Sequence, residues 1–131
     1  MLGTGLDNQA IEARDGRYPV TPDGRYFVVR GRLWRMANPF LDINERARLA
    51  GKLMEARRNV GRARRAEEAD LEKVAHAAVD FVKRALGERG PVWWTDGAPD
   101  LSGQMARDTS YAEWFKGIES ERDGAAAGSA R

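Results

Sequence analysis

The chain has 131 residues, of which 42% are hydrophobic and 32% charged, and its formal net charge is +2. This size fits one domain, and the composition excludes a membrane-embedded protein and a wholly disordered one. The sequence contains no cysteine and one histidine, which excludes disulfides, thiol catalysis, cysteine-ligated metals and a multi-histidine metal site within one chain.

The N-terminal part predicts a small antiparallel β-meander after a flexible lead-in over residues 1–13. Residues 17–20 are expected to form a short edge strand, because Pro19 has no amide proton to give to a central ladder. The TPDG sequence at 21–24 predicts a turn. Residues 25–29 (RYFVV) are rich in aromatic and β-branched side chains, which favour a strand.

Arg30 and Gly31 predict a two-residue turn into a returning strand over residues 32–36. In this register Phe27 lies opposite Trp34, which makes an aromatic cross-strand pair. The sequence leaves open which face of the meander is buried, because both faces carry apolar residues. One face carries Tyr26, Val28 and Leu33, and the other carries Phe27, Val29, Trp34 and Met36.

Two helices follow and predict an αα-hairpin. Asp42 and Glu45 have the spacing of a capping box at the start of a helix that runs to about Arg65. The second helix spans about 68–86, where Gly87 or Gly90 supplies a left-handed stop. The expected buried stripes are Leu49, Ala50, Leu53, Met54, Ala56 and Val60 on the first helix, and Leu71, Val74, Ala75, Ala78, Phe81, Val82 and Ala85 on the second.

The C-terminal segment begins at Val92, before Trp93 and Trp94, and is rich in aromatic residues. Ser110 and Glu113 have capping-box spacing and predict a short helix, and residues 119–131 are expected to be a disordered tail. We predict that the meander and this segment both dock on the αα-hairpin. The fold class is therefore α+β: an N-terminal antiparallel β-meander, an αα-hairpin and a C-terminal aromatic segment with a short helix, in a single globular domain over 14–118.

Three stretches together resemble a family of small uncharacterised proteins from GC-rich bacteria. They are DGRYFVVRGRLWR at 23–35, GPVWWTDGAPD at 90–100, and the segment from Met105 to Phe115 that contains YAEWF. The resemblance covers about residues 16–116. It implies a bacterial cytoplasmic protein and carries over no activity and no site residue.

The charges are divided along the chain. Residues 14–65 hold 14 basic and five acidic residues, whereas residues 66–131 hold eight basic and thirteen acidic residues. Basic groups suit phosphates or an acidic protein, although pairing with the acidic half, in one chain or in a dimer, is the alternative. The candidate basic surface comprises Arg25, Arg30, Arg32, Arg35, Arg46, Arg48, Lys52, Arg58 and Arg62.

The TDGAPD loop at 95–100 is a weaker candidate site. Trp94, Asp96 and Asp100 form a candidate ligand loop, yet Asp-Gly and Pro-Asp are ordinary turn formers. His76 has no second histidine one turn away and is expected to be solvated or hydrogen-bonded. No phosphate-binding glycine motif or nucleophile elbow occurs, so we predict no cofactor and no metal.

Three functions remain open at this stage. The first is a non-enzymatic binding module whose basic surface meets an acidic partner, either a nucleic acid or an acidic protein. The second is a protein-interaction or homodimer module in which basic and acidic halves pair. The third is a small enzyme that acts on an anionic substrate through Asp96 and Asp100. We expect no membrane partner, because no apolar run approaches the roughly 20 residues of a span.

Overall fold

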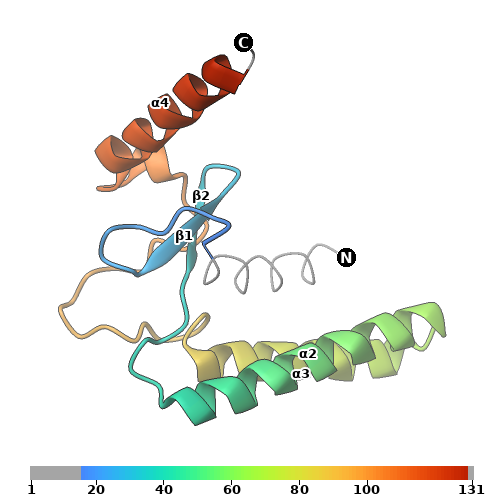
Figure 1. Cartoon of the computed structure of the whole chain (residues 1–131). Helices are drawn as coiled ribbons and strands as arrows, with labels where there is room; N and C mark the ends of the chain where they lie inside the picture. The colour runs from blue at the N-terminus through green and yellow to red at the C-terminus, as the bar shows by residue number, and fades with distance from the viewer. Residues whose placement is uncertain (1–15, 130–131) are drawn as a thin grey trace. The chain divides into compact units, whose positions relative to one another are not determined.

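The computed structural model describes residues 16–129 and the side chains of residues 16–121. The described residues form two compact units (Figure 1). The first comprises residues 16–36 and 99–129, and the second comprises residues 37–98. The fold is α+β, as predicted, while the single domain over 14–118 stays a prediction. Within residues 16–129, no helix has the length and apolar character needed to cross a membrane.

A two-stranded antiparallel hairpin forms the centre of the first unit. Strand β1 (Tyr26–Val29) pairs with β2 (Arg32–Arg35) in the predicted register, with Phe27 opposite Trp34. Arg30 and Gly31 make the two-residue turn with φ values of 54° and 80°, because a turn with positive φ at both positions matches the twist of the strands. The expected edge strand over 17–20 is reduced to one bridge, between Val20 and Phe27.

Both edges of this hairpin are covered by segments of irregular backbone. The amide of Val28 donates to the Pro19 carbonyl at 2.9 Å, on the β1 side. On the β2 side, the amide of Leu33 donates to Gln104 at 2.9 Å, and the Gly103 amide donates back to Leu33 at 2.7 Å. These bonds satisfy backbone N–H and C=O groups at the edges of the hairpin. In an isolated hairpin the same groups would be exposed and could pair with another strand.

The two faces of the hairpin pack on different segments. Phe27 and Val29 lie in a cluster with Tyr18, Val20, Trp34 and Met36. On the opposite face, the ring of Tyr26 meets Tyr111 edge to face, with 5.7 Å between centroids. The sequence left open which face of the hairpin is buried. Within this unit both faces are packed, and the C-terminal segment covers the face that carries Tyr26. Its docking on the αα-hairpin stays a prediction.

The C-terminal segment of the first unit ends in a long helix. The 3-10 helix η1 (Ala106–Asp108) leads into α4 (Ala112–Ser129). The sequence predicted a short helix and a disordered tail over 119–131, but α4 continues through most of that segment. Ala125, Ala126 and Ala127 lie in this extension, and alanine has the highest helix propensity.

The second unit is a helical hairpin, as predicted. Helix α2 (Ile43–Arg65) begins at Asp42, whose carboxylate accepts hydrogen bonds from the amides of Asn44 and Glu45 at 3.0 and 3.3 Å. In a complete capping box the Glu45 side chain would also bond the Asp42 amide. Here the Glu45 carboxylate pairs with Arg48 instead. Helix α3 (Ala69–Leu86) ends at Gly87, whose φ is 89°.

The core between α2 and α3 differs from the predicted stripe on the second helix. The buried residues are Leu49, Leu53, Ala56 and Val60 from α2, and Ala75, Val79, Val82 and Leu86 from α3. On α3, Leu71, Val74, Ala78, Phe81 and Ala85 are exposed, so the prediction that they are buried is wrong. The helix carries two apolar stripes, and α2 packs on the one that contains Val79 and Leu86.

Candidate nucleic-acid interface

Arg35 is the clearest departure from the predicted basic surface. Its side chain is 1% exposed and lies 3.4 Å from the Asp100 carboxylate, so it is unavailable to an external partner. We expected it at the surface because side chains alternate between the two faces of a strand. This alternation does not show which arginine the C-terminal segment covers. Of the other three arginines on the hairpin, Arg25 lies 3.9 Å from Asp23 and is half-buried, while Arg30 and Arg32 are exposed.

Helix α2 holds the other predicted basic residues, which belong to the second unit. Arg46 donates to the Asn38 carbonyl at 3.4 Å. Arg48 forms an exposed ion pair with Glu45, and this hydrogen bond lowers the pKa of Glu45 and raises that of Arg48. Lys52, Arg58 and Arg62 are exposed. The site predicted across the meander and helix one is thus divided between two units, each described by itself.

One further arginine of α2, Arg64, forms an ion pair within the chain. Arg64 lies 3.0 Å from the Glu72 carboxylate, which also contacts the His76 ring at 3.2 Å. The hydrogen bond from Arg64, and then that to His76, lower the pKa of Glu72. His76 is exposed and hydrogen-bonded, as predicted. The Arg64–Glu72 and Arg35–Asp100 pairs each join the basic and acidic parts of the sequence within one chain.

The outer face of α2, which we define as the side that carries Arg58, Arg62 and Arg65, remains basic after this pairing. These residues are spaced i, i+4 and i+7, so they share one side of the helix. All three are exposed, and within residues 16–121 no carboxylate lies within ion-pair distance of them. Arg62 also donates a hydrogen bond to the side-chain oxygen of Asn59, at 3.2 Å.

Arg65 was missed when the basic surface was predicted. The signal that identifies it is the helical spacing from Arg58 and Arg62, which places all three guanidinium groups together. Met54 lies on the same side and is 46% exposed, although the sequence assigned it to the core. The outer face therefore combines three cations that have no carboxylate partner among residues 16–121 with the accessible apolar side chain of Met54.

The candidate ligand loop forms turns in the structure. Asp96 accepts a hydrogen bond from the Ala98 amide at 3.0 Å, and the Trp94 ring nitrogen donates to the Ala98 carbonyl at 2.8 Å. Asp100 accepts from the amide of Ser102 at 3.0 Å and pairs with Arg35. These contacts are those of turn-forming residues. Among residues 16–129, no group of three or more potential metal ligands comes together.

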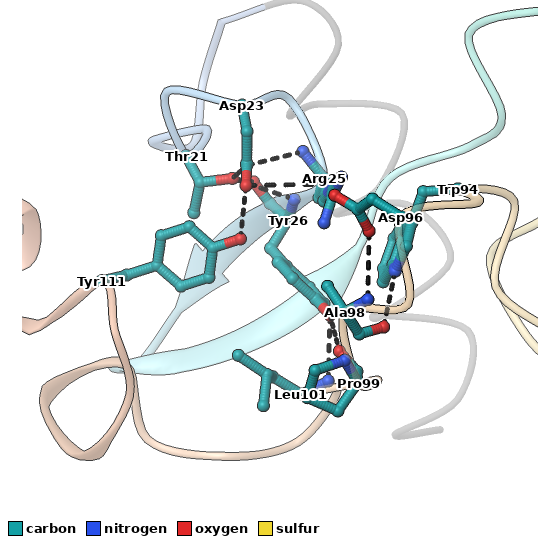
Figure 2. A network of polar contacts seen from close by, with 10 residues as sticks. All are labelled: Thr21, Asp23, Arg25, Tyr26, Trp94, Asp96, Ala98, Pro99, Leu101 and Tyr111. Atoms are coloured by element: carbon teal, nitrogen blue, oxygen red, sulfur yellow. Dashed lines mark hydrogen bonds and ion pairs between the residues drawn. The ribbon is translucent and has the colours of Figure 1, made fainter.

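A polar network in the first unit was not anticipated from the sequence (Figure 2). The Tyr26 hydroxyl accepts from the Leu101 amide at 2.9 Å and donates to the Pro99 carbonyl at 3.4 Å. Burial raises the pKa of Tyr26 above its ordinary value. The Tyr111 hydroxyl donates to Asp23 at 2.6 Å. These bonds fix the C-terminal segment on the hairpin, and their role is structural.

Comparison with known proteins gives no information about function, so the assignment depends on the geometry. The sequence matches no protein-family model, and no curated protein or solved structure is significantly similar to it.

Proposed function

We propose that this protein is a non-enzymatic binding module whose outer face of α2 contacts the phosphates of a nucleic acid. The observation that supports the proposal is the row of Arg58, Arg62 and Arg65, all exposed and without a carboxylate partner among residues 16–121. A bacterial cytoplasmic setting, which the resemblance implies, would place DNA and RNA within reach.

The chemistry of the outer face suits a phosphate backbone. From Arg58 to Arg65 the helix rises about 10 Å, at 1.5 Å per residue, while duplex DNA carries about one negative charge per 1.7 Å of its axis. Several phosphates therefore lie within reach of three guanidinium groups, each of which can bind an oxygen pair. Such contacts carry no sequence information, so we expect binding to be largely independent of sequence.

Fluorescence anisotropy of a labelled random-sequence DNA duplex tests the proposal, with a labelled RNA duplex as a second probe. Three phosphate contacts predict a slope of about −2.7 for the logarithm of the binding constant against the logarithm of salt concentration. The variant R58E/R62E/R65E is expected to lose binding at about 50 mM salt, a concentration at which this electrostatic term is strong.

The matched control makes the same change in net charge away from the outer face of α2. The variant K73E/R107E/K116E replaces three exposed basic residues on other elements, and we expect it to keep most of the affinity. Circular dichroism shows whether both variants remain folded. Equal loss in the two variants would mean that only net charge matters, and binding by R58E/R62E/R65E at the wild-type level would refute the site.

The enzyme hypothesis remains a separate proposal with less support. Asp96 and Asp100 each accept hydrogen bonds from nearby backbone amides, at 3.0 Å. A carboxylate that holds a turn in this way is already engaged, and a ligand would have to displace those bonds. The basic outer face has no carboxylate partner within residues 16–121, and the bond from Arg62 to Asn59 is a neutral side-chain contact, which is why we prefer the binding module.

A further inference from the structure

The exposed side of α3 forms a continuous apolar seam, which we define as Leu71, Val74, Ala78, Phe81 and Ala85. These positions repeat at intervals of three and four residues, the pattern that forms a helix–helix contact. Leu71 is 55% exposed, Val74 67% and Phe81 73%. Scattered apolar residues on a surface are ordinary, whereas a contiguous row of this length marks an interaction surface.

A groove runs beside the seam between the two helices, which lie side by side in Figure 1. Two hollows of about 380 and 660 Å³ lie along it and share Asn59 and Ala78 in their linings. The seam forms the α3 side of the groove. The α2 side carries apolar Leu49, Ala56 and Ala63 together with the polar residues Glu45, Arg48, Lys52, Glu55, Asn59 and Arg62. The groove is thus an apolar strip bordered by charge, which suits a helix of similar character.

We propose that the α3 seam binds the α3 seam of a second copy of this chain, with the two helices antiparallel about a two-fold axis near Ala78. Reversal about this point places Leu71 opposite Ala85 of the second copy and Val74 within one residue of Phe81. Large side chains therefore face smaller ones along the seam. At the centre two alanines meet, and small residues there allow the helix axes to approach to about 8 Å.

The charges beside the seam support the antiparallel arrangement. Asp70 and Arg84 lie on the flank of the seam away from α2, near opposite ends of α3. Reversal about Ala78 brings Asp70 of each copy to within about 3 Å, along the axis, of Arg84 of the other. Arg84 already donates to Asp80 through Nε at 2.8 Å, and its terminal nitrogens can serve a second carboxylate. A parallel pairing would instead place like charges at the same level.

The size of the face predicts a reversible dimer. Helix α3 is about 27 Å long and about 10 Å wide, so its face presents roughly 270 Å² per copy, against about 800 Å² per partner in a standard interface. This area, with one buried aromatic per copy, fits a concentration-dependent association. We expect monomer at low micromolar concentration and dimer at some hundreds of micromolar, which sedimentation equilibrium of the full chain measures.

Introduced cysteines test the pairing and its direction, since the natural chain has none. Ala78→Cys places two thiols together at the two-fold axis, so mild oxidation should give a covalent dimer. Ala85→Cys is the matched control, because its two copies would lie about 21 Å apart along the axis in an antiparallel pair. Cross-linking of both variants would indicate a parallel pair and overturn the arrangement, and cross-linking of neither would overturn the seam.

Charge exchange gives a second, independent test. D70R and R84D should each lose self-association, because each places like charges opposite one another across the seam. An equimolar mixture should associate again, because both cross-seam pairs become complementary. Recovery in the mixture supports the antiparallel contact, and its absence contradicts it.

Point variants distinguish association through the seam from nonspecific hydrophobic association. Phe81→Glu should shift the chain to monomer at every concentration, whereas Ile43→Glu should not, although Ile43 is 77% exposed as well. Circular dichroism confirms that both stay helical. A wild-type chain that is monomeric at several hundred micromolar, or a dimer that Phe81→Glu leaves intact, would overturn the proposal and point to another occupant of the seam.

Discussion

The Tyr111 hydroxyl donates a 2.6 Å hydrogen bond to the Asp23 carboxylate, across 88 positions of sequence (Figure 2). Asp23 lies in the turn before β1, and its second oxygen accepts from the Thr21 hydroxyl at 2.7 Å. The bond therefore ties the start of the C-terminal helical segment to the first turn of the hairpin. This pair is one of several contacts that join the two separate stretches of sequence that make up the first unit.

Replacement of Tyr111 by Phe should lower the free energy of unfolding by about 1 kcal/mol, the usual net value of a hydrogen bond. The bond is partly exposed, so a larger loss is not expected. Tyr18→Phe is the matched control, because the structure gives Tyr18 a ring contact with Phe27 and no hydroxyl bond to a described residue. Urea denaturation measures both, and equal losses would contradict the role of the bond.

The same pair predicts how stability depends on pH. Burial raises the pKa of Asp23, but hydrogen bonds from Tyr111, Thr21 and the Arg25 amide outweigh it and hold the pKa below the ordinary value. Burial and the neighbouring Asp23 carboxylate raise the pKa of Tyr111.

The contribution of Asp23 is thus present above its unfolded pKa of about 3.9 and is lost as the pH falls through its folded pKa. That of Tyr111 is present below about pH 10 and is lost as the pH rises toward its folded pKa. The difference in stability between wild type and Tyr111→Phe should be constant between these limits and shrink beyond them. A difference that stays constant from pH 3 to 11 would contradict this linkage.

Lys83 and Glu88 form a buried ion pair at the end of α3, with 3.6 Å between Nζ and Oε1 and side chains that are 4% and 2% exposed. Lys83→Met removes the positive charge beside a buried carboxylate and should cost about 3 kcal/mol or more. The double variant K83M/E88L should recover much of this loss, because it removes both charges. Chemical denaturation of the three proteins decides the matter, and a double variant less stable than Lys83→Met would contradict it.

Gly87 is required by both its conformation and its surroundings. Its φ is 89°, and a Cβ there would lie 3.1 Å from the Asn38 side chain and 3.1 Å from the Trp93 ring. Gly87→Ala should therefore cost more than the 1–2 kcal/mol or so of a left-handed alanine. Gly97→Ala is the control, since its φ is 82° and a Cβ there meets nothing within 4 Å. Similar melting temperatures for the two variants would show that the close contacts do not matter.

Asp100 should matter more for stability than Asp96. Removal of the Asp100 carboxylate takes one ion-pair partner from buried Arg35 and also breaks the turn to Ser102. A buried charge that loses a partner costs more than a lost turn. We therefore expect Asp100→Ala to lower the melting temperature well beyond Asp96→Ala, and the reverse order in a thermal scan would contradict this assignment.

The sequence by itself determined the local structure of this protein. The register of β1 and β2, the Arg30-Gly31 turn, the start of α2 at Asp42 and the left-handed stop at Gly87 all follow from residue types at short spacing. Such features depend on backbone conformation, capping and turn chemistry, which act between near neighbours in the chain. For the same reason, the expectation of an αα-hairpin was confirmed.

Tertiary structure alone decided which of several similar surfaces is buried. Helix α3 has two apolar stripes, and only packing against α2 shows that Val79 and Leu86 enter the core while Phe81 remains outside. In the same way, nothing near Arg35 in the sequence indicates that Asp100 will cover it. The choice depends on the free energy of contacts between distant segments, which a local pattern does not contain. The candidate basic surface could therefore be predicted only in part: tertiary contacts remove Arg35 from it, while the helical spacing of Arg58 and Arg62 extends it to Arg65.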